Sequence, residues 1–291
     1  MTDAVRSKFR FLMVRHFTLP EHVHERFGMN DRAPKEAMLM NYQHLAPLLE
    51  DVDWDFHPGP MATHGEGDGY PETREELAIV GSNRLPVVRQ ACESGQYNAI
   101  ILLGGVDPGF WEAREIAQPF GVAVTANAFA QMHVACMLGA RFSVLDISEG
   151  QSVKMVDLIR LYGFADRCAS IRVVDYPLPR KPFDYGRSTL DERRGFARGE
   201  SSAMLEEAVR EAVACIKEDG AESIILGCSG CYWLQDPLQK RLKELGWDIP
   251  VLEGYRAAIE VAKLMVNLGV GASGIAFPPP LPRRWRRIKT F

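Results

Sequence analysis

Two short segments of this chain are near copies of each other. Residues 99–105 read Ala-Ile-Ile-Leu-Leu-Gly-Gly, and residues 223–229, 124 positions later, read Ser-Ile-Ile-Leu-Gly-Cys-Ser. Each segment is a short apolar run without polar interruption that ends in small residues. Such runs are typical of strands that are buried on both faces of a parallel sheet. The pair therefore predicts two equivalent strands in an α/β fold.

The two copies differ where each strand should open into a loop. Ligands of open α/β sheets bind just beyond the carboxyl ends of the strands, so a duplicated strand end predicts two half-sites that face one ligand. At this point the second copy has Cys228, whereas the first has Gly104. One half-site should therefore present a thiol, and the other only its backbone.

Strands and helices alternate along the whole chain. The alternation predicts the α/β class: two pseudosymmetric lobes, each a mostly parallel sheet flanked by helices, with the active site in the cleft between them. We expect residues 1–122 plus 254–275 to form the first lobe, 123–253 the second, and 276–291 a proline- and arginine-rich C-terminal arm. Apolar segments predict strands at 9–14, 54–57, 99–103, 122–125, 141–147, 171–174, 223–226 and 249–252.

Helical spacing and capping residues mark the segments between these strands. A helix is expected within residues 31–49, and residues 176–199, rich in proline and charge, are expected to form a surface excursion. Further helices are predicted at 72–94, 127–138, 153–162, 201–219, 237–245 and 255–268, and a short one follows Asp107-Pro108-Gly109 and ends at Ala117.

Composition and charge narrow the class of function. The chain has 291 residues, 46% of them hydrophobic, and a formal net charge of −4, which argues against general nucleic-acid or membrane-surface binding. No apolar run approaches the roughly 18 residues of a membrane span, and the N-terminal residues lack the apolar core of a secretion signal. A cytoplasmic protein is therefore predicted. The six cysteines are scattered, so no disulfide framework is expected.

Cys228 is the main candidate for chemistry. It lies between Gly227 and Ser229-Gly230, directly after a predicted buried strand. Small neighbours let a ligand approach the backbone, and free N–H groups at a strand-to-helix turn bind oxyanions. The same field is expected to lower the pKa of the thiol. Such a thiol can exchange a proton with carbon or attack as a nucleophile; the alternative is an inert, buried cysteine.

Other motifs point to chemistry less directly. Cys228 and Cys231 form a Cys-x-x-Cys pair, but no second pair completes a zinc site. His16 follows the first predicted strand and should face the cleft, and Gly59-Pro60 opens a glycine-containing loop placed to cover a ligand. The sequence has no Walker loop and no Gly-x-Gly-x-x-Gly after a strand, so nucleotide binding is not supported.

Four segments of the sequence carry distinctive motifs. They are Val-Asp-Pro-Gly-Phe-Trp-Glu-Ala-Arg-Glu at 106–115, Leu-Gly-Ala-Arg-Phe-Ser-Val at 138–144, Tyr-Gly-Phe-Ala-Asp-Arg-Cys-Ala-Ser at 162–170, and 219–230, which ends in Gly-Cys-Ser-Gly. In this order they resemble the hydantoin racemases. The resemblance implies the aspartate/glutamate/hydantoin racemase superfamily, with two α/β lobes, a site between them and no cofactor. Such enzymes usually place one cysteine on each lobe. One thiolate removes a proton from a carbon acid, and the opposite thiol returns one to the other face.

This chain departs from that pattern at two strand ends. It keeps the second cysteine as Cys228 but has Gly104 in place of the first, and it has Arg15-His16 where hydantoin racemases tend to carry Asn-Pro-Asn. A plain hydantoin is therefore not the expected substrate. A lone cysteine opposite a glycine also resembles arylmalonate decarboxylase, whose thiol protonates the enediolate left by loss of carbon dioxide. That enzyme holds its carboxylate with hydroxyl side chains just after the glycine, which Gly105 and Val106 do not supply.

The predicted function is a cofactor-independent racemase or isomerase that acts on a carbon acid next to a carbonyl through an enolate-like intermediate. Cys228 is the expected acid/base, and Asp107 or His16 the nearest substitute for the missing thiol. The predicted partner is a small-molecule carbonyl or carboxylate substrate, with no nucleic acid, membrane or metal, in a homo-oligomer. The other predicted oxyanion and substrate-binding residues are Gly104, Gly105, Ser229, Gly230, Arg15, Gly59, Pro60, Asn127, Ser148, Gly254 and Tyr255.

Some of these residues have more specific expected roles. Arg15 should pair with a substrate carboxylate, and Tyr70, Phe129 or Tyr255 should line an apolar pocket. The alternatives are a decarboxylase with Cys228 as sole proton donor, a catalytically silent binding protein, and a Cys-x-x-Cys redox or zinc protein. If the scaffold has lost only its first base, a Gly104→Cys variant is expected to gain racemase activity.

Overall fold

Two parallel sheets of four strands form the centre of the molecule. The computed structural model describes residues 7–27, 29–61, 69–180, 188–278 and 284. The first sheet has the order β2-β1-β3-β4 and the second β6-β5-β7-β8. Their strands are β1 Phe9–Val14, β2 Val52–His57, β3 Ala99–Leu102, β4 Ala123–Ala126, β5 Phe142–Asp146, β6 Cys168–Val173, β7 Ser223–Leu226 and β8 Val251–Leu252.

The near-copied segments are equivalent strands of the two sheets. β3 lies between β1 and β4, and β7 lies between β5 and β8, the same position in each order. All eight residues of β3 and β7 are buried, as expected for strands covered on both faces. The sequence prediction of an α/β fold with two similar halves is confirmed.

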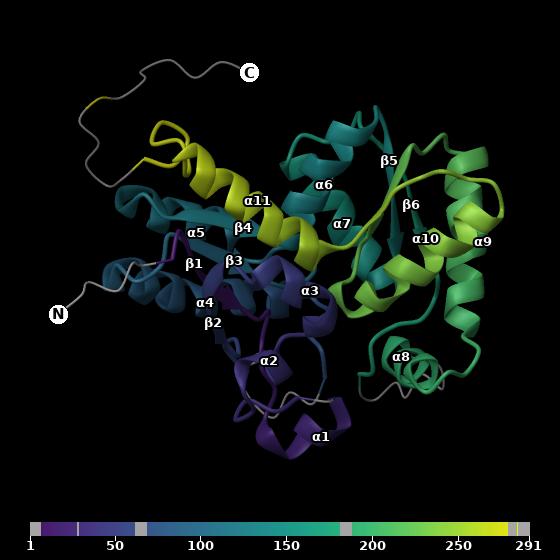
Figure 1. Cartoon of the computed structure of the whole chain (residues 1–291), viewed down its shortest axis with the longest axis horizontal. Helices are drawn as coiled ribbons and strands as arrows, with labels where there is room; N and C mark the ends of the chain where they lie inside the picture. Colours follow the sequence, from purple (N-terminus) through teal and green to yellow (C-terminus); the bar gives the residue numbers. More distant parts are fainter. Residues whose placement is uncertain (1–6, 28, 62–68, 181–187, 279–283, 285–291) are drawn as a thin grey trace.

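Helices cover both faces of each sheet, and the two halves lie side by side (Figure 1). The larger helices begin at side-chain caps: Thr73 forms a capping box with Glu76 at the start of α4, and Ser202 caps α9. The helical elements are η1 Glu21–Val23, α1 His24–Phe27, α2 Lys35–Met38, α3 Tyr42–Leu49, α4 Arg74–Ser94, α5 Phe110–Ala117, η2 Gln118–Phe120, α6 Asn127–Leu138, α7 Glu149–Leu161, α8 Thr189–Ala197, α9 Ala203–Lys217, η3 Ser229–Leu234, α10 Gln235–Glu244 and α11 Gly254–Leu268.

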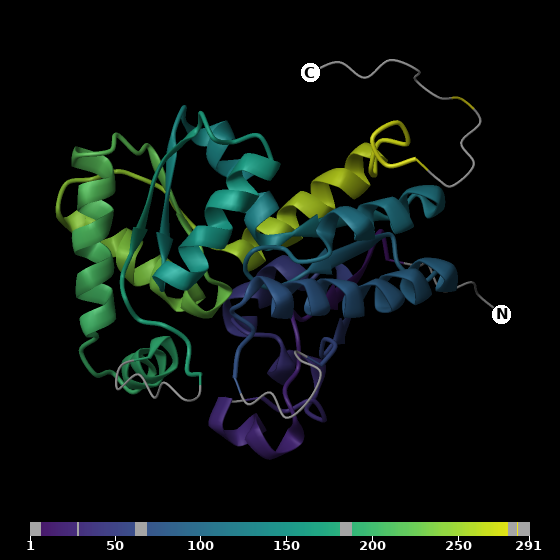
Figure 2. The same cartoon turned by 180° about the vertical axis from the view of Figure 1, so that it is seen from behind.

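The chain crosses between the sheets after β4. Because β4 pairs with β3, the crossing follows Ala126 instead of lying at the predicted boundary between 122 and 123. The last helix, α11, returns to pack against β3, β4 and α3 of the first sheet and also against α6. In Figure 2 it runs beside the first sheet, and its first turn reaches α10, where Arg256 donates to Gln235 at 3.0 Å.

Two predicted segments differ in the structure. The helix expected within 31–49 is broken into α2 and α3, because Asn41 has a left-handed backbone with a φ of 66°. The predicted surface excursion at 176–199 contains α8 and buries Tyr176, Thr189 and Leu190. Leu190 packs with Phe17 of the first half, so the described parts of this segment, 176–180 and 188–199, include residues that pack between the two halves.

Most of the predicted C-terminal arm, 279–283 and 285–291, lies outside the described residues. At the described start of the arm, Phe277 is buried and packs against α5, with its ring centroid 5.1 Å from that of Trp111. No helix among the described residues has the length and apolar character needed to cross a membrane.

Candidate active site

A cavity of about 100 Å³ lies where the ends of β1, β3 and β7 meet. His16 and Gly104 of the first half line it together with Cys228 and Ser229 of the second. A larger groove of about 530 Å³ runs along α4, α5 and α7, but it contains neither Cys228 nor His16. The small cavity is therefore the one that combines the two half-sites predicted from the repeated strands.

Cys228 is held at the floor of this cavity by the turn after β7. Its side chain is 3% exposed, and its Sγ accepts hydrogen bonds from the N–H of Gly230 at 3.3 Å and from the side chain of Gln151. Burial, followed by the nearby carboxyl of Asp146, raises the pKa of the thiol to about 12. The expectation of a lowered pKa is wrong, because loss of hydration outweighs the backbone donors here. Cys228 is therefore a protonated thiol at neutral pH.

Gly227 makes room for Asp146 beneath the same turn. A Cβ at position 227 would lie 2.8 Å from Cγ of Asp146. The Oδ1 atom of Asp146 accepts the N–H of Ile147 at 2.8 Å, while its Oδ2 is buried without a hydrogen-bond partner among the described residues. Burial raises the pKa of this carboxyl to about 7.

His16 occupies the space that a side chain at position 104 would need. Gly104 has a φ of 122°, and a Cβ there would lie 2.5 Å from both Cγ and Nδ1 of His16. His16 is partly buried, and its Nε2 atom is inaccessible and has no hydrogen-bond partner within the described part of the chain. Burial, followed by the charge of Arg84, lowers the pKa of His16 well below its ordinary value. A neutral imidazole thus lines the same cavity as the thiol of Cys228.

This geometry corrects the expected outcome of the Gly104→Cys variant. A cysteine at that position would clash with the imidazole and would adopt a backbone conformation that only glycine enters readily. The space next to Gly104, where a cysteine side chain would lie, is occupied by the imidazole of His16.

Arg84 was not identified from the sequence as a residue that supports the site. Its side chain bonds to the chain at the ends of both β1 and β3. It projects from α4, is fully buried, and donates from Nη2 to the carbonyl oxygens of Val14 at 2.8 Å and Leu103 at 2.9 Å. Burial lowers its pKa to about 9. The residues after these two carbonyls lead to His16 and Gly104, so Arg84 fixes both loops behind the imidazole.

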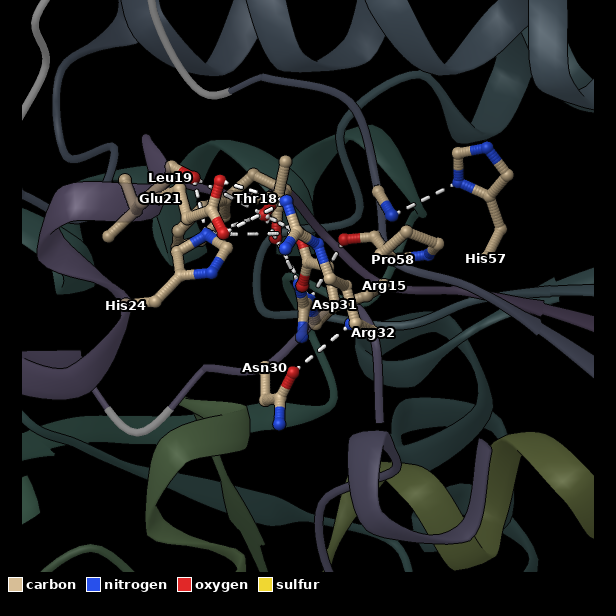
Figure 3. Close-up of polar contacts among 12 residues, drawn as sticks. Arg15, Thr18, Leu19, Glu21, His24, Asn30, Asp31, Arg32, His57 and Pro58 are labelled. Carbon is tan, nitrogen blue, oxygen red and sulfur yellow. Dashed lines mark hydrogen bonds and ion pairs between the residues drawn. The ribbon is translucent and has the colours of Figure 1, made fainter. Parts of the chain in front are cut away.

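Arg15 does not have the free guanidinium that was expected to bind a substrate carboxylate. Its Nη2 forms an ion pair with Asp31, and its Nε donates to the carbonyl oxygens of Phe17 at 3.1 Å and Pro58 at 2.9 Å. Asp31 also accepts a hydrogen bond from Thr18, and the network folds the segment after β1 onto the loop after β2 (Figure 3). Arg15 lines the cavity, but its charge is neutralised.

Gly59 and Pro60 support this network and are absent from the cavity wall among the described residues. Gly59 has a φ of 88°, and a Cβ there would lie 2.7 Å from the carbonyl oxygen of Arg15. The carbonyl oxygen of Pro60 accepts the N–H of Thr18 at 2.7 Å. The rest of the predicted covering loop, residues 62–68, lies outside the described residues.

Asp107 is engaged elsewhere and does not line the cavity. Its carboxyl accepts the N–H groups of Ala128 at 3.0 Å and Phe129 at 2.8 Å, and the hydroxyl of Tyr162 at 3.0 Å. Asp107 and its neighbour Val106 both have positive φ values, of 43° and 54°, so these bonds hold a strained loop in place. Burial raises the pKa of the carboxyl to about 6. Of the two predicted substitutes for the missing thiol, the cavity contains only His16.

The remaining predicted residues divide into two groups. Ser229, Gly230 and Tyr255 line the cavity, whereas Gly105 lies beside it, where a Cβ would approach Nε2 of Gln151 to 3.0 Å. Outside the cavity wall, Ser148 caps α7, and a Cβ on Gly254 would lie 2.5 Å from Cβ of Asn127, so these two residues pack helix starts together. Phe129, expected to line an apolar pocket, is absent from the described cavity wall and packs on His133 with ring centroids 4.0 Å apart and ring planes tilted by 43°.

Gln151 and helix α8 were not identified from the sequence, whereas Tyr70 was. Gln151 of α7 contacts the sulfur of Cys228, and Arg193 and Leu190 of α8 line the cavity. Tyr70, which was expected to line a pocket, does so, and burial raises its pKa to about 12. Gln151 and α8 carry no motif and are far from Cys228 in sequence, so only the fold brings them to the site.

The Cys-x-x-Cys pair is not joined in the structure. Cys228 and Cys231 are both free, buried thiols, and Cys231 donates its S–H to the carbonyl oxygen of Cys228, with 2.8 Å between the sulfur and the oxygen. The described residues contain no group of three or more His, Cys, Asp or Glu side chains placed to hold a metal.

Comparison with known proteins identifies the family. The sequence pattern described as Asp/Glu/Hydantoin racemase matches residues 63–262. The chain belongs to the Asp/Glu/hydantoin racemase family. It is 31% identical over 195 residues to hydantoin racemase from Pseudomonas sp. (strain NS671), an alignment that covers 67% of this chain and 68% of the relative.

Solved structures of a racemase and a decarboxylase share the fold. Allantoin racemase from Pseudomonas fluorescens superposes with a TM-score of 0.65 at 22% identity, covering 95% of this chain and 99% of the other. A glycine-to-cysteine mutant of arylmalonate decarboxylase superposes with a TM-score of 0.54 at 14% identity, covering 89% and 93%. The racemase family membership and the two-lobed α/β fold agree with the sequence predictions.

Proposed function

We propose that the protein is a racemase or isomerase that moves a proton at a carbon next to a carbonyl, with Cys228 and His16 as the two groups that exchange protons with that carbon. The observation that carries the proposal is the position of His16. Its imidazole fills the space of a side chain at position 104 and lines the same cavity as Cys228. An imidazole from the end of β1 thus takes the role of the first cysteine of the superfamily.

The protonation states of the two groups are complementary. The lowered pKa of His16 leaves a neutral imidazole that can accept a proton at neutral pH, and the raised pKa of Cys228 leaves a thiol that holds one. Proton transfer by such positioned side chains contributes roughly 100- to 10,000-fold to a rate. The pair therefore suits a reaction that removes a proton from one face of a carbon and supplies one to the other.

The proposed step balances as follows. His16 removes the proton from the substrate carbon, and the electron pair of the broken C–H bond moves into the carbonyl to form an enolate. Cys228 then donates its thiol proton to the opposite face, which leaves an imidazolium and a thiolate. That state converts the other isomer in the reverse direction, and proton exchange with solvent after product release restores the starting state.

Backbone N–H groups next to the imidazole support the enolate. The N–H groups of Gly104 and Gly105 donate to no backbone or side-chain acceptor in the described ranges, which leaves them available to a developing oxyanion. Losing one such donor costs about 3 kcal/mol of transition-state stabilisation in a preorganised site.

A solvent-deuterium exchange assay tests the proposal. The protein is incubated in D₂O with 5-substituted hydantoins, amino acids and arylmalonates, and incorporation of deuterium at carbon is followed by NMR. Cys228→Ser and His16→Asn should each reduce exchange by roughly 100- to 10,000-fold. Cys136→Ser, at a partly exposed thiol on α6 outside the cavity, is the matched control and should keep full activity. Full exchange in Cys228→Ser would rule out the proposed acid/base role.

A decarboxylase is the second candidate, and the protonated state of Cys228 favours it. Loss of carbon dioxide creates the enolate without a base, so one thiol proton completes the reaction. His16→Asn separates the two functions: a racemase loses activity, whereas a decarboxylase that depends on Cys228 alone continues to release carbon dioxide from an arylmalonate.

A further inference from the structure

Arg193 is a cation on the cavity wall, and none of the residues that the structure describes gives it an acidic partner. It belongs to α8 and lines the cavity that contains Cys228 and His16. Its Nη1 lies 3.7 Å from Sδ of Met40, and its guanidinium lies 5.9 Å from the ring centroid of Tyr232. Within the described ranges, no carboxylate lies within ion-pair distance of Arg193.

The other arginines of this segment are paired differently. Arg194 forms an ion pair with Asp191 at 3.8 Å, and Arg198 forms one with Glu200 at 2.7 Å. Both are turned toward acidic residues of their own segment, whereas Arg193 reaches across to Met40 of the first half. The orientation of Arg193 is therefore not explained by pairing within its own segment.

The charged side chains among the described residues of the cavity wall are positive. Its described residues include the cations Arg15 and Arg193 and no Asp or Glu. Since Arg15 is compensated by Asp31, the uncompensated positive charge is that of Arg193. A cavity with low-dielectric walls and one sign of charge concentrates ligands of the opposite sign, and a guanidinium binds a carboxylate through two parallel hydrogen bonds.

We infer that Arg193 binds a carboxylate of the substrate, so that the natural substrate is an anionic carbon acid and not a neutral ring compound. The inference rests on the proposed function, because it identifies the substrate class of the same cavity. In this arrangement the carboxylate lies toward α8, while the reacting carbon lies between His16 and Cys228. Apolar residues of the wall, among them Met29 and Leu178, are left for the remainder of the substrate.

Two probes of nearly equal shape test the inference. Hydantoin-5-acetate carries a carboxylate, and hydantoin-5-acetamide is its neutral counterpart. Calorimetric titration should show that the wild-type protein binds the acetate roughly 10- to 100-fold more tightly than the acetamide, the range for a hydrogen-bonded charged group. Arg193→Met should remove this preference while leaving acetamide binding within about twofold. Arg193→Lys should keep part of it.

Arg198→Met is the matched control, because Arg198 lies at the end of the same helix and pairs with Glu200 instead of facing the cavity. It should retain the full preference for the acetate. Equal affinity of the wild-type protein for the two probes, no binding of either at millimolar concentration, or an unchanged preference in Arg193→Met would overturn the inference.

Two different measurements distinguish a failure of this inference from a failure of the proposed function. Titration reports binding without turnover, and deuterium exchange at C5 of the same two compounds reports proton transfer. Acetate binding that depends on Arg193 without any exchange would support the carboxylate site and contradict the racemase. Deuterium exchange that depends on Cys228, together with equal binding of the two probes, would support the proposed proton transfer and contradict the carboxylate site.

Discussion

Gly104 and His16 share a space that only one side chain can fill. From the sequence, the glycine reads as a lost cysteine, because the repeat aligns it with Cys228 and shows nothing of residues far away in the chain. The structure brings the imidazole of His16 against it. Sequence reasoning located Cys228, Gly104 and His16 individually, but it could not show which of Asp107 and His16 enters the cavity, since that depends on hydrogen bonds formed across the fold.

Replacing Gly104 tests this shared space. Gly104→Cys should lower the free energy of unfolding, because the new side chain meets the imidazole and the φ of 122° is strained for any residue with a Cβ. Adding His16→Ala should remove the clash but not the backbone strain. Urea denaturation of both single variants and the double variant should give a favourable coupling of about 0.5–3 kcal/mol. Strictly additive effects would mean that the two side chains do not compete.

At the scale of elements, α4 supports the active-site edge of the first sheet. Its capped N-terminus and 21-residue length were largely predictable from sequence pattern, but the role of Arg84 within it was not, because a charged residue on a helix ordinarily faces solvent. The break at Asn41 and the burial of α8 were also missed. The break lies at the left-handed backbone of Asn41, and the burial of α8 depends on packing against distant segments such as Phe17, neither of which hydrophobic spacing encodes.

Removing the Arg84 guanidinium should weaken the fold measurably. Arg84→Met removes this donor from the buried carbonyl oxygens of Val14 and Leu103. The Val14 oxygen keeps the N–H of Leu103 at 2.9 Å, so the main cost falls on the Leu103 oxygen. Because an unsatisfied buried group costs roughly 1–3 kcal/mol, we expect a loss in that range in urea denaturation. Arg89→Met, at an exposed position on the same helix, should change stability by less than about 0.5 kcal/mol. Equal effects of the two substitutions would contradict the structural role of Arg84.

For the whole molecule, the repeated strands were sufficient to predict the architecture. The two similar apolar segments, 124 residues apart in the sequence, predicted two equivalent strands. In the structure these strands, β3 and β7, take the same position in the two sheets. The predicted boundary between the lobes, at residues 122 and 123, lies one strand too early, because β4 pairs with β3 of the first sheet. The four residues of β4 are too few to indicate from their sequence which sheet the strand joins. Buried carboxyls lie near the strand ends of both halves, namely Asp107, Asp146 and Glu253.

These carboxyls make the stability of the molecule depend on pH. Burial raises the pKa of Asp146 from 3.8 to about 7, so the folded state binds more protons than the unfolded chain between these values. The contribution of Asp146 is therefore fully present below pH 3.8 and is lost as the pH rises through about 7. Asp146→Asn should raise the urea midpoint at pH 8 relative to the wild type and change it less at pH 5. A larger gain at pH 5 would contradict a raised pKa.

The cover over the small cavity is built from both halves, with Arg193 of α8 against Met40 and Leu190 against Phe17. The enclosed space of about 100 Å³ is below the roughly 300 Å³ of ordinary ligand pockets. Loading a compound of drug-like size thus requires α8 to part from the segment around Met40, and so does the departure of product. A covalent cross-link from α8 to residue 40 is therefore expected to prevent entry and release of any ligand larger than this space.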